Sequence, residues 1–182
     1  MPPKMSKLNL LILDANVVIH LHELGIWQKL IAVCTVHVPR TIVEESNFYE
    51  VDGERNYIDL NEDINGGRIK VFDVSLQDVR AFLDRFDGIY AAGIHAGEAE
   101  ALAHLCKSSE QFMISSGDAM VYRVLGRLGR GDQGISLEEI LQKVGLQQKQ
   151  LPNSCSKTFR EKLTQMGATD AIHGVGLKKP KK

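Results

Sequence analysis

The sequence predicts an α/β fold in which a central, mostly parallel sheet lies between two layers of helices. Residues 8–13 form an almost entirely apolar run without alternation, which is typical of a strand buried on both faces. Shorter strand candidates at 36–38, 68–74 and 112–114 are separated by segments in which apolar residues recur at helical spacing. Strands that alternate with helices along a chain join through right-handed crossovers, which gives parallel pairing and helices on both faces.

Capping residues and glycine stops define the predicted helices. The first ends at Gly25, and another has Pro39 in its first turn, where the missing amide is harmless. Ser75 and Ser136 are typical N-cap residues. The predicted helices are 17–25, 26–33 with Trp27 as a core residue, 40–46, 75–84, 98–106, 119–128, 136–144 and 156–166. Residues 47–67 are expected to be a polar surface excursion with some helix around 57–64, and 88–97 a glycine-rich loop.

Length and composition indicate an ordinary globular protein. The 182 residues suffice for one domain with a core, predicted at 1–145, and a C-terminal helical appendage with a basic tail at 146–182. The formal net charge of −1 excludes a grossly basic nucleic-acid binder. The three cysteines form no CxxC pair, which argues against a zinc cluster or a disulfide framework. We expect a cytoplasmic protein without a membrane span, since no apolar run is long enough to cross a bilayer.

Acidic side chains follow the predicted strands or lie in the first turns of the next helices. Asp14 ends the first strand, with Asn16 two positions on; the others are Glu44, Glu45, Glu98, Glu100 and Asp118. A plainer interpretation is that Asp14 or Asn16 only caps the following helix. Because the carboxyl ends of parallel strands share one edge, we instead expect several carboxylates to converge there. A divalent cation relieves such repulsion, and hard oxygen ligands favour Mg²⁺ or Mn²⁺ over zinc.

Helix geometry chooses within each acidic pair. Residues two apart point roughly 200° apart around a helix, so Glu98 and Glu100 cannot both face one ion. Glu98 shares its face with the buried stripe that includes Leu102, which favours Glu98. Ile42, three residues before Glu45, favours Glu45 over Glu44, and both rejected residues stay open as alternatives. The six histidines show no ligand spacing and are expected to be surface or core residues.

Four short motifs, taken in order, resemble the PIN domain family of metal-dependent nucleases, which includes the VapC-type toxins. They are Leu-Asp-Ala-Asn at 13–16, Val-Pro-x-x-Ile-x-x-Glu at 38–45, Gly-Glu-Ala-Glu-Ala-Leu-Ala at 97–103 and Ile-Ser-Ser-Gly-Asp at 114–118. The resemblance covers roughly residues 8–145. It implies a PIN-like three-layer α/β/α fold with extra C-terminal helices. The segments 47–67 and 146–182 make the chain longer than a compact toxin.

The resemblance implies a divalent-metal-dependent endoribonuclease that hydrolyses RNA phosphodiester bonds. Carried over by position, Asp14, Glu45, Glu98 and Asp118 are the acidic metal-binding quartet, and Asn16 and Ser116 are supporting polar residues. Ser116 is expected to position a carboxylate and to have no nucleophilic role. An antitoxin protein and a homodimer are candidate partners through the resemblance alone.

Other functions are compatible with parts of the sequence. Arg40, Arg123 and Arg127 are candidate contacts to the RNA backbone, although they are equally typical of a solvated surface. The main alternative is an inactive PIN-like module that only binds RNA or a protein partner. A phosphate-handling α/β domain of the receiver or phosphatase kind is disfavoured, because no clearly placed catalytic lysine or threonine follows a later strand.

Overall fold

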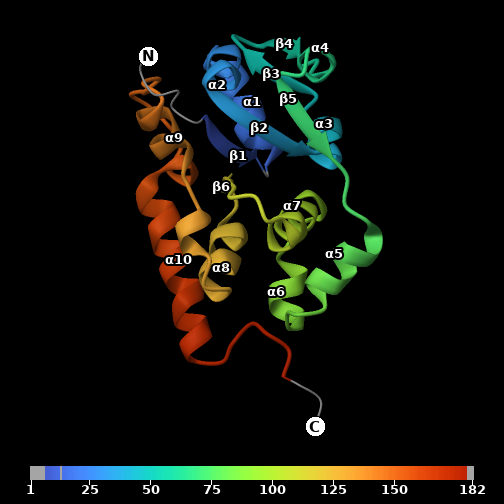
Figure 1. Ribbon diagram of the computed structural model, residues 1–182. Helices are drawn as coiled ribbons and strands as arrows, with labels where there is room; N and C mark the ends of the chain where they lie inside the picture. Colours follow the sequence, from blue (N-terminus) through green and yellow to red (C-terminus); the bar gives the residue numbers. More distant parts are fainter. Residues whose placement is uncertain (1–6, 13, 180–182) are drawn as a thin grey trace, which may run out of the picture.

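The computed structural model describes residues 7–12 and 14–179 and contains a four-stranded parallel sheet (Figure 1). The strands are β1 (Leu8–Ile12), β2 (Cys34–Pro39), β5 (Ile69–Phe72) and β6 (Met113–Ser115). They lie in the order β5-β2-β1-β6. The predicted parallel sheet is therefore confirmed, including the position of β5 at an edge. The expected last strand residue, 13, and the end of the basic tail, 180–182, lie outside the described residues.

The strand order reverses direction at β1. The chain moves from β1 outward to β2 and β5, and then returns to place β6 on the other side of β1. The gap between the carboxyl ends of β1 and β6 is therefore a topological switch point, where ligands of open α/β sheets gather. The residues that follow these two strands include Asp14 and Asp118.

A separate apolar core covers each face of the sheet, because successive side chains of a strand point to opposite faces. Val36 and Val38 of β2 belong to the core of one face, while His37 between them contacts Phe112 in the other. Helices that pack on the first face are α1 (Ala15–Glu23), α2 (Trp27–Val33), α3 (Arg40–Glu45) and α9 (Leu137–Lys143). Those of the second face are α5 (Leu76–Leu83), α6 (Gly88–Ala92), α7 (Ala96–Lys107) and α8 (Ala119–Arg127) (Figure 1).

The excursion between α3 and β5 contains a β-hairpin that the sequence analysis did not predict. Strands β3 (Phe48–Val51) and β4 (Glu54–Tyr57) pair antiparallel across Asp52 and Gly53. Both turn residues have positive φ, 51° and 79°, as a two-residue type I′ hairpin turn requires. The helix expected around 57–64 is shorter and later, at α4 (Asn61–Asn65). The loop expected at 88–97 also contains helix α6.

The buried carboxylate of Asp63 fastens this excursion to helix α2. It accepts hydrogen bonds from Trp27 Nε1 at 2.8 Å, from Gln28 Nε2 at 3.1 Å and from Arg68 Nε at 2.7 Å. Burial raises the pKa of Asp63, but these donors together outweigh it and leave the pKa below its ordinary value. The ionised carboxylate is therefore the form that the folded state prefers.

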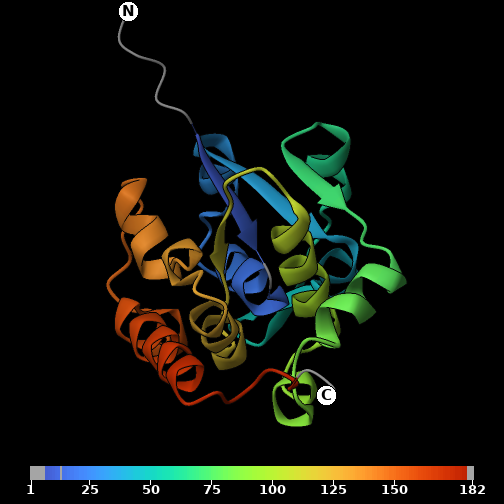
Figure 2. The same cartoon turned by 60° about the horizontal axis from the view of Figure 1, so that its bottom comes forward.

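The C-terminal helix α10 (Lys157–Ile172) packs along α8 and extends beyond the predicted end at 166 (Figure 2). Two glycines allow this contact. A Cβ atom on Gly126 would lie 2.0 Å from the carbonyl oxygen of Thr164, and one on Gly167 would lie 1.9 Å from that of Arg123.

The chain from Asn153 to Cys155 forms a short 3₁₀ helix, η2, and Gly131–Gln133 forms another, η1. No helix in the described part of the chain is both long and apolar enough to cross a membrane.

We expect Gly167→Ala to destabilise the protein. The added methyl group meets a backbone carbonyl that no rotamer change can move, and overpacking of this kind costs about 1–3 kcal/mol. Gly88→Ala in α6 is the matched control, since its added Cβ meets no atom within 4 Å. Urea unfolding of both variants measures the effect. A Gly167→Ala protein as stable as the wild type would contradict the close helix contact.

We expect Asp63→Asn to lower the free energy of unfolding by about 1–3 kcal/mol at neutral pH, because Asn offers one acceptor and adds a donor facing Arg68. The folded-state pKa of Asp63 is lowered, so its contribution is fully present above the unfolded pKa of about 4 and is lost as the pH falls through the folded value. Unfolding of wild type and variant at several pH values checks this. A difference in stability that stays constant down to pH 2 would contradict it.

Candidate metal centre

Asp14 links the carboxyl ends of the neighbouring strands β1 and β6. It is the N-cap of α1, and its Oδ1 accepts a hydrogen bond from the Asn16 amide at 2.8 Å. Its Oδ2 accepts from the amide of Gly117, just after β6, at 3.2 Å. The capping interpretation of Asp14 is therefore correct as local structure, and the same carboxylate also lies at the switch point. Asn16 is an exposed residue, and it takes part here through its backbone amide.

Asp118 is held at the start of α8 by a short chain of hydrogen bonds. Its Oδ1 accepts from the amide of Met120 at 2.7 Å, and its own amide donates to Ser116 Oγ at 2.9 Å. The buried Ser116 donates its amide to the hydroxyl of Tyr122 at 3.1 Å, and that hydroxyl donates to the carbonyl of Ile135. Ser116 thus holds the backbone amide of Asp118, and its role in positioning a carboxylate stays a prediction.

Glu98 is the buried member of the site. Its residue is 5% exposed, and its Oε2 accepts a hydrogen bond from the backbone amide of His95 at 3.0 Å. The pKa of Glu98 is raised to about 7, mainly by burial and to a smaller extent by the charges of Asp118 and Asp14, whereas His95 opposes the shift. Two carboxylates from other segments therefore act electrostatically on Glu98.

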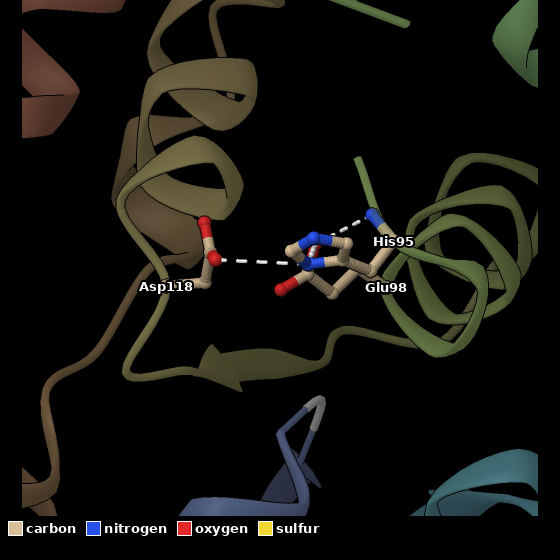
Figure 3. A group of neighbouring side chains, drawn as sticks. All are labelled: His95, Glu98 and Asp118. Atoms are coloured by element: carbon tan, nitrogen blue, oxygen red, sulfur yellow. Dashed lines mark hydrogen bonds and ion pairs between the residues drawn. The ribbon is translucent and has the colours of Figure 1, made fainter. Parts of the chain in front are cut away.

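The ring of His95 lies near two of these carboxylates (Figure 3). Its Nδ1 is 3.6 Å from Glu98 Oε2 and 3.8 Å from Asp118 Oδ2. One ligand atom from each of the three residues lies within 4.8 Å of the others. The histidine side chain is 75% exposed, so the group opens to solvent on that side.

A cavity of about 330 Å³ brings in the fourth predicted carboxylate. Asp14, Glu45, His95 and Glu98 all line it, together with Ile42. Glu45 comes from the end of α3 and is exposed. Asp14, Glu45 and Glu98 thus share one cavity, and Asp118 joins them through its contact with His95 and its effect on Glu98.

The alternative acidic residues lie differently. Glu100 accepts a hydrogen bond from Thr41 Oγ1 at 2.8 Å, which uses its carboxylate in the contact between α7 and α3. Glu44 is exposed, and among the described residues it is Glu45, and not Glu44, that lines the cavity. The geometry therefore favours Glu98 and Glu45 as the members that face the site.

The predicted RNA-contacting arginines are engaged within the protein. Arg40 Nε lies 2.8 Å from Asp73 Oδ1, and Arg123 Nε lies 2.6 Å from Asp170 Oδ2. Arg127 Nε donates to the carbonyl of Val175. Contact of these side chains with RNA stays a prediction.

The sequence does not predict two parts of this region. It indicates a surface or core role for His95, although residues three positions apart at the start of a helix can bring their side chains together, as His95 and Glu98 do. The second is a further cavity of about 270 Å³, lined by Asp14 together with His20, Ser154 and Cys155. Residues from the segment after 145 therefore lie beside Asp14, while the predicted boundary at 145 stays a prediction.

The donor set is suitable for a divalent cation. Carboxylates from Asp14, Glu45, Glu98 and Asp118 supply hard oxygens, which Mg²⁺ and Mn²⁺ prefer. Burial is the main cause of the raised pKa of Glu98, and the charges of Asp118 and Asp14 add to it, so a cation beside Glu98 would favour its ionised form. Comparison with family models, curated proteins and solved structures gives no match for this chain.

We expect Glu98→Gln to stabilise the metal-free protein by about 1 kcal/mol at pH 8, because it removes a charge that is disfavoured mainly by burial and also by the charges of Asp118 and Asp14. Glutamine still accepts from the His95 amide, so the start of α7 is preserved. Thermal unfolding in the presence of a chelator measures the change.

Glu139→Gln is the matched control for this substitution. Glu139 accepts from the Ser136 amide at the same position of α9, but it also pairs with Arg160 at 2.7 Å, and its pKa is lowered despite its burial. Its substitution is expected to destabilise the protein. If Glu98→Gln destabilised the protein as Glu139→Gln does, the proposed cost of the buried Glu98 charge would be contradicted.

Proposed function

We propose that this chain is a PIN-like, divalent-metal-dependent endoribonuclease. The observation that carries the proposal is the shared cavity of Asp14, Glu45 and Glu98, with Asp118 beside it at the switch point between β1 and β6. These are the four positions that the resemblance to the PIN family assigns to the acidic quartet. A convergence of four carboxylates from four separate segments is costly and is typical of a cation site.

The residues of the site would divide the work as follows. Asp14, Glu98 and Asp118 would hold the cation, and Glu45, which lines the same cavity as Asp14 and Glu98, would complete the ligand set. The Gly117 and Met120 amides orient Asp14 and Asp118, and Ser116 fixes the turn between β6 and α8. When bound, Mg²⁺ or Mn²⁺ supplies an activated water and stabilises charge on the phosphate oxygens. The exposed side, at His95, is where a phosphodiester enters.

RNA as the substrate is part of the same proposal and is supported by the family resemblance alone. The assignment to a toxin–antitoxin pair, with an antitoxin protein as partner, has that support only, as does a homodimer. Acidic metal sites do not distinguish bases, so these residues do not determine which RNA sequence is cleaved.

We expect the wild type to cleave single-stranded RNA with Mg²⁺ or Mn²⁺, and Asp14→Asn and Asp118→Asn to lose at least about 100-fold in rate. A matched pair tests the neighbouring acids: Glu45→Gln should lose activity, whereas Glu44→Gln, outside the cavity lining, should retain it. Cleavage of a fluorescent RNA, with a chelator control, is the measurement.

Metal binding separates the nuclease from the inactive binding module. Titration of Mn²⁺ by calorimetry should show binding to the wild type that Asp14→Asn and Asp118→Asn weaken. Wild-type protein that binds no Mn²⁺ at millimolar concentration and leaves varied RNAs intact would contradict the proposed function.

A further inference from the structure

We propose that the imidazole of His95 is a ligand of the metal, beside Glu98 and Asp118, and that it makes the site prefer Mn²⁺ to Mg²⁺. This inference rests on the proposed metal centre and deepens it by naming a nitrogen ligand outside the acidic quartet. Figure 3 shows the ring beside the Glu98 carboxylate of α7, with the Asp118 carboxylate at the start of α8 across from it.

The backbone of His95 is fixed by the same carboxylate that the ring approaches. The His95 amide donates to Glu98 Oε2 at 3.0 Å, so residue 95 stays at the start of α7. From this anchored position the ring Nδ1 lies 3.6 Å and 3.8 Å from one oxygen of Glu98 and one of Asp118. The ring therefore reaches the site from a rigid helix start.

The spacing of the three groups leaves room for an ion. Both nitrogen–oxygen distances exceed the usual hydrogen-bond length of about 2.7–3.2 Å, so neither contact is tight enough to compete with a ligand bond. Ligand atoms about 2.0–2.2 Å from one ion are roughly 3 Å apart, so small side-chain rotations suffice to close the group. The exposed ring is free to make that rotation, while Glu98 is held by burial.

The chemistry of imidazole determines the preference. Mg²⁺ favours an all-oxygen shell and keeps several of its waters. Mn²⁺ also accepts oxygen ligands, but its binding gains more from a nitrogen donor than Mg²⁺ binding does. Binding to sites with both nitrogen and oxygen ligands strengthens further along the first-row series. Loss of the imidazole should therefore weaken Mn²⁺ binding much more than Mg²⁺ binding.

The test uses the full chain, the metals alone and the variant His95→Ser. Serine is a good N-cap residue, so α7 keeps its start while the imidazole is removed. His173→Ser, at the exposed C-cap of α10, is the matched control. Electron spin echo envelope modulation of bound Mn²⁺ reports a ligand nitrogen directly, and calorimetry gives the Kd for Mn²⁺ and Mg²⁺.

We expect nitrogen modulation in the wild type and in His173→Ser, and its loss in His95→Ser together with at least a tenfold weaker Kd for Mn²⁺ and less than a twofold change for Mg²⁺. Wild-type protein that binds Mn²⁺ without nitrogen modulation, or a His95→Ser variant with unchanged Mn²⁺ affinity, would overturn this inference and leave the acidic metal centre intact. Wild-type protein that binds neither ion would overturn both this inference and the proposed function.

Discussion

The hydrogen bond between the Gly117 amide and Asp14 Oδ2 joins the carboxyl ends of β1 and β6, and the candidate site is built around that junction. The two strands are neighbours in the sheet but are separated by about a hundred residues of chain, which the crossovers through β2 and β5 return to the same edge. Once Asp14 and Asp118 are held at this edge, α3 and α7 need only approach it to bring Glu45 and Glu98 within the same cavity.

Backbone amides make this concentration of negative charge tolerable. Asp14, Asp118 and Glu98 each accept a hydrogen bond from an amide at the start of α1, α8 or α7, respectively. Helix N-termini carry partial positive charge, so each carboxylate is stabilised where it stands. Glu98 nevertheless keeps a raised pKa, because burial and its two acidic neighbours outweigh that support. The amides thus hold the carboxylates in place but supply no full positive charge to balance them. A bound cation would supply that charge.

Local signals in the sequence were sufficient for the four strands of the parallel sheet and for most helices. Asp14 and Asp118 follow strands and Glu98 lies in the first turn of a helix, and parallel topology brings such positions to one edge, whereas Glu45 reaches it from the end of α3. The type I′ turn at Asp52 and Gly53 was also a local signal, but the short strands on either side of it lack the regular apolar alternation expected of a hairpin.

Features that depend on long-range packing could not be predicted in this way. Gly167 is in the interior of α10, where glycine usually disfavours a helix, and its role is to let α10 approach α8 closely. Likewise, the contact of His95 with Asp118 and the position of Ser154 near Asp14 depend on segments that meet only in the folded chain.

The most direct test of the metal centre is a crystal of the full chain grown with Mn²⁺ and measured at a wavelength where Mn²⁺ scatters anomalously. The geometry described here predicts an anomalous peak bonded to carboxylate oxygens of Asp14, Glu98 and Asp118. The proposed metal centre would be contradicted if Asp14 and Asp118 lay too far apart to share an ion. It would also be contradicted if Mn²⁺ bound only elsewhere on the protein.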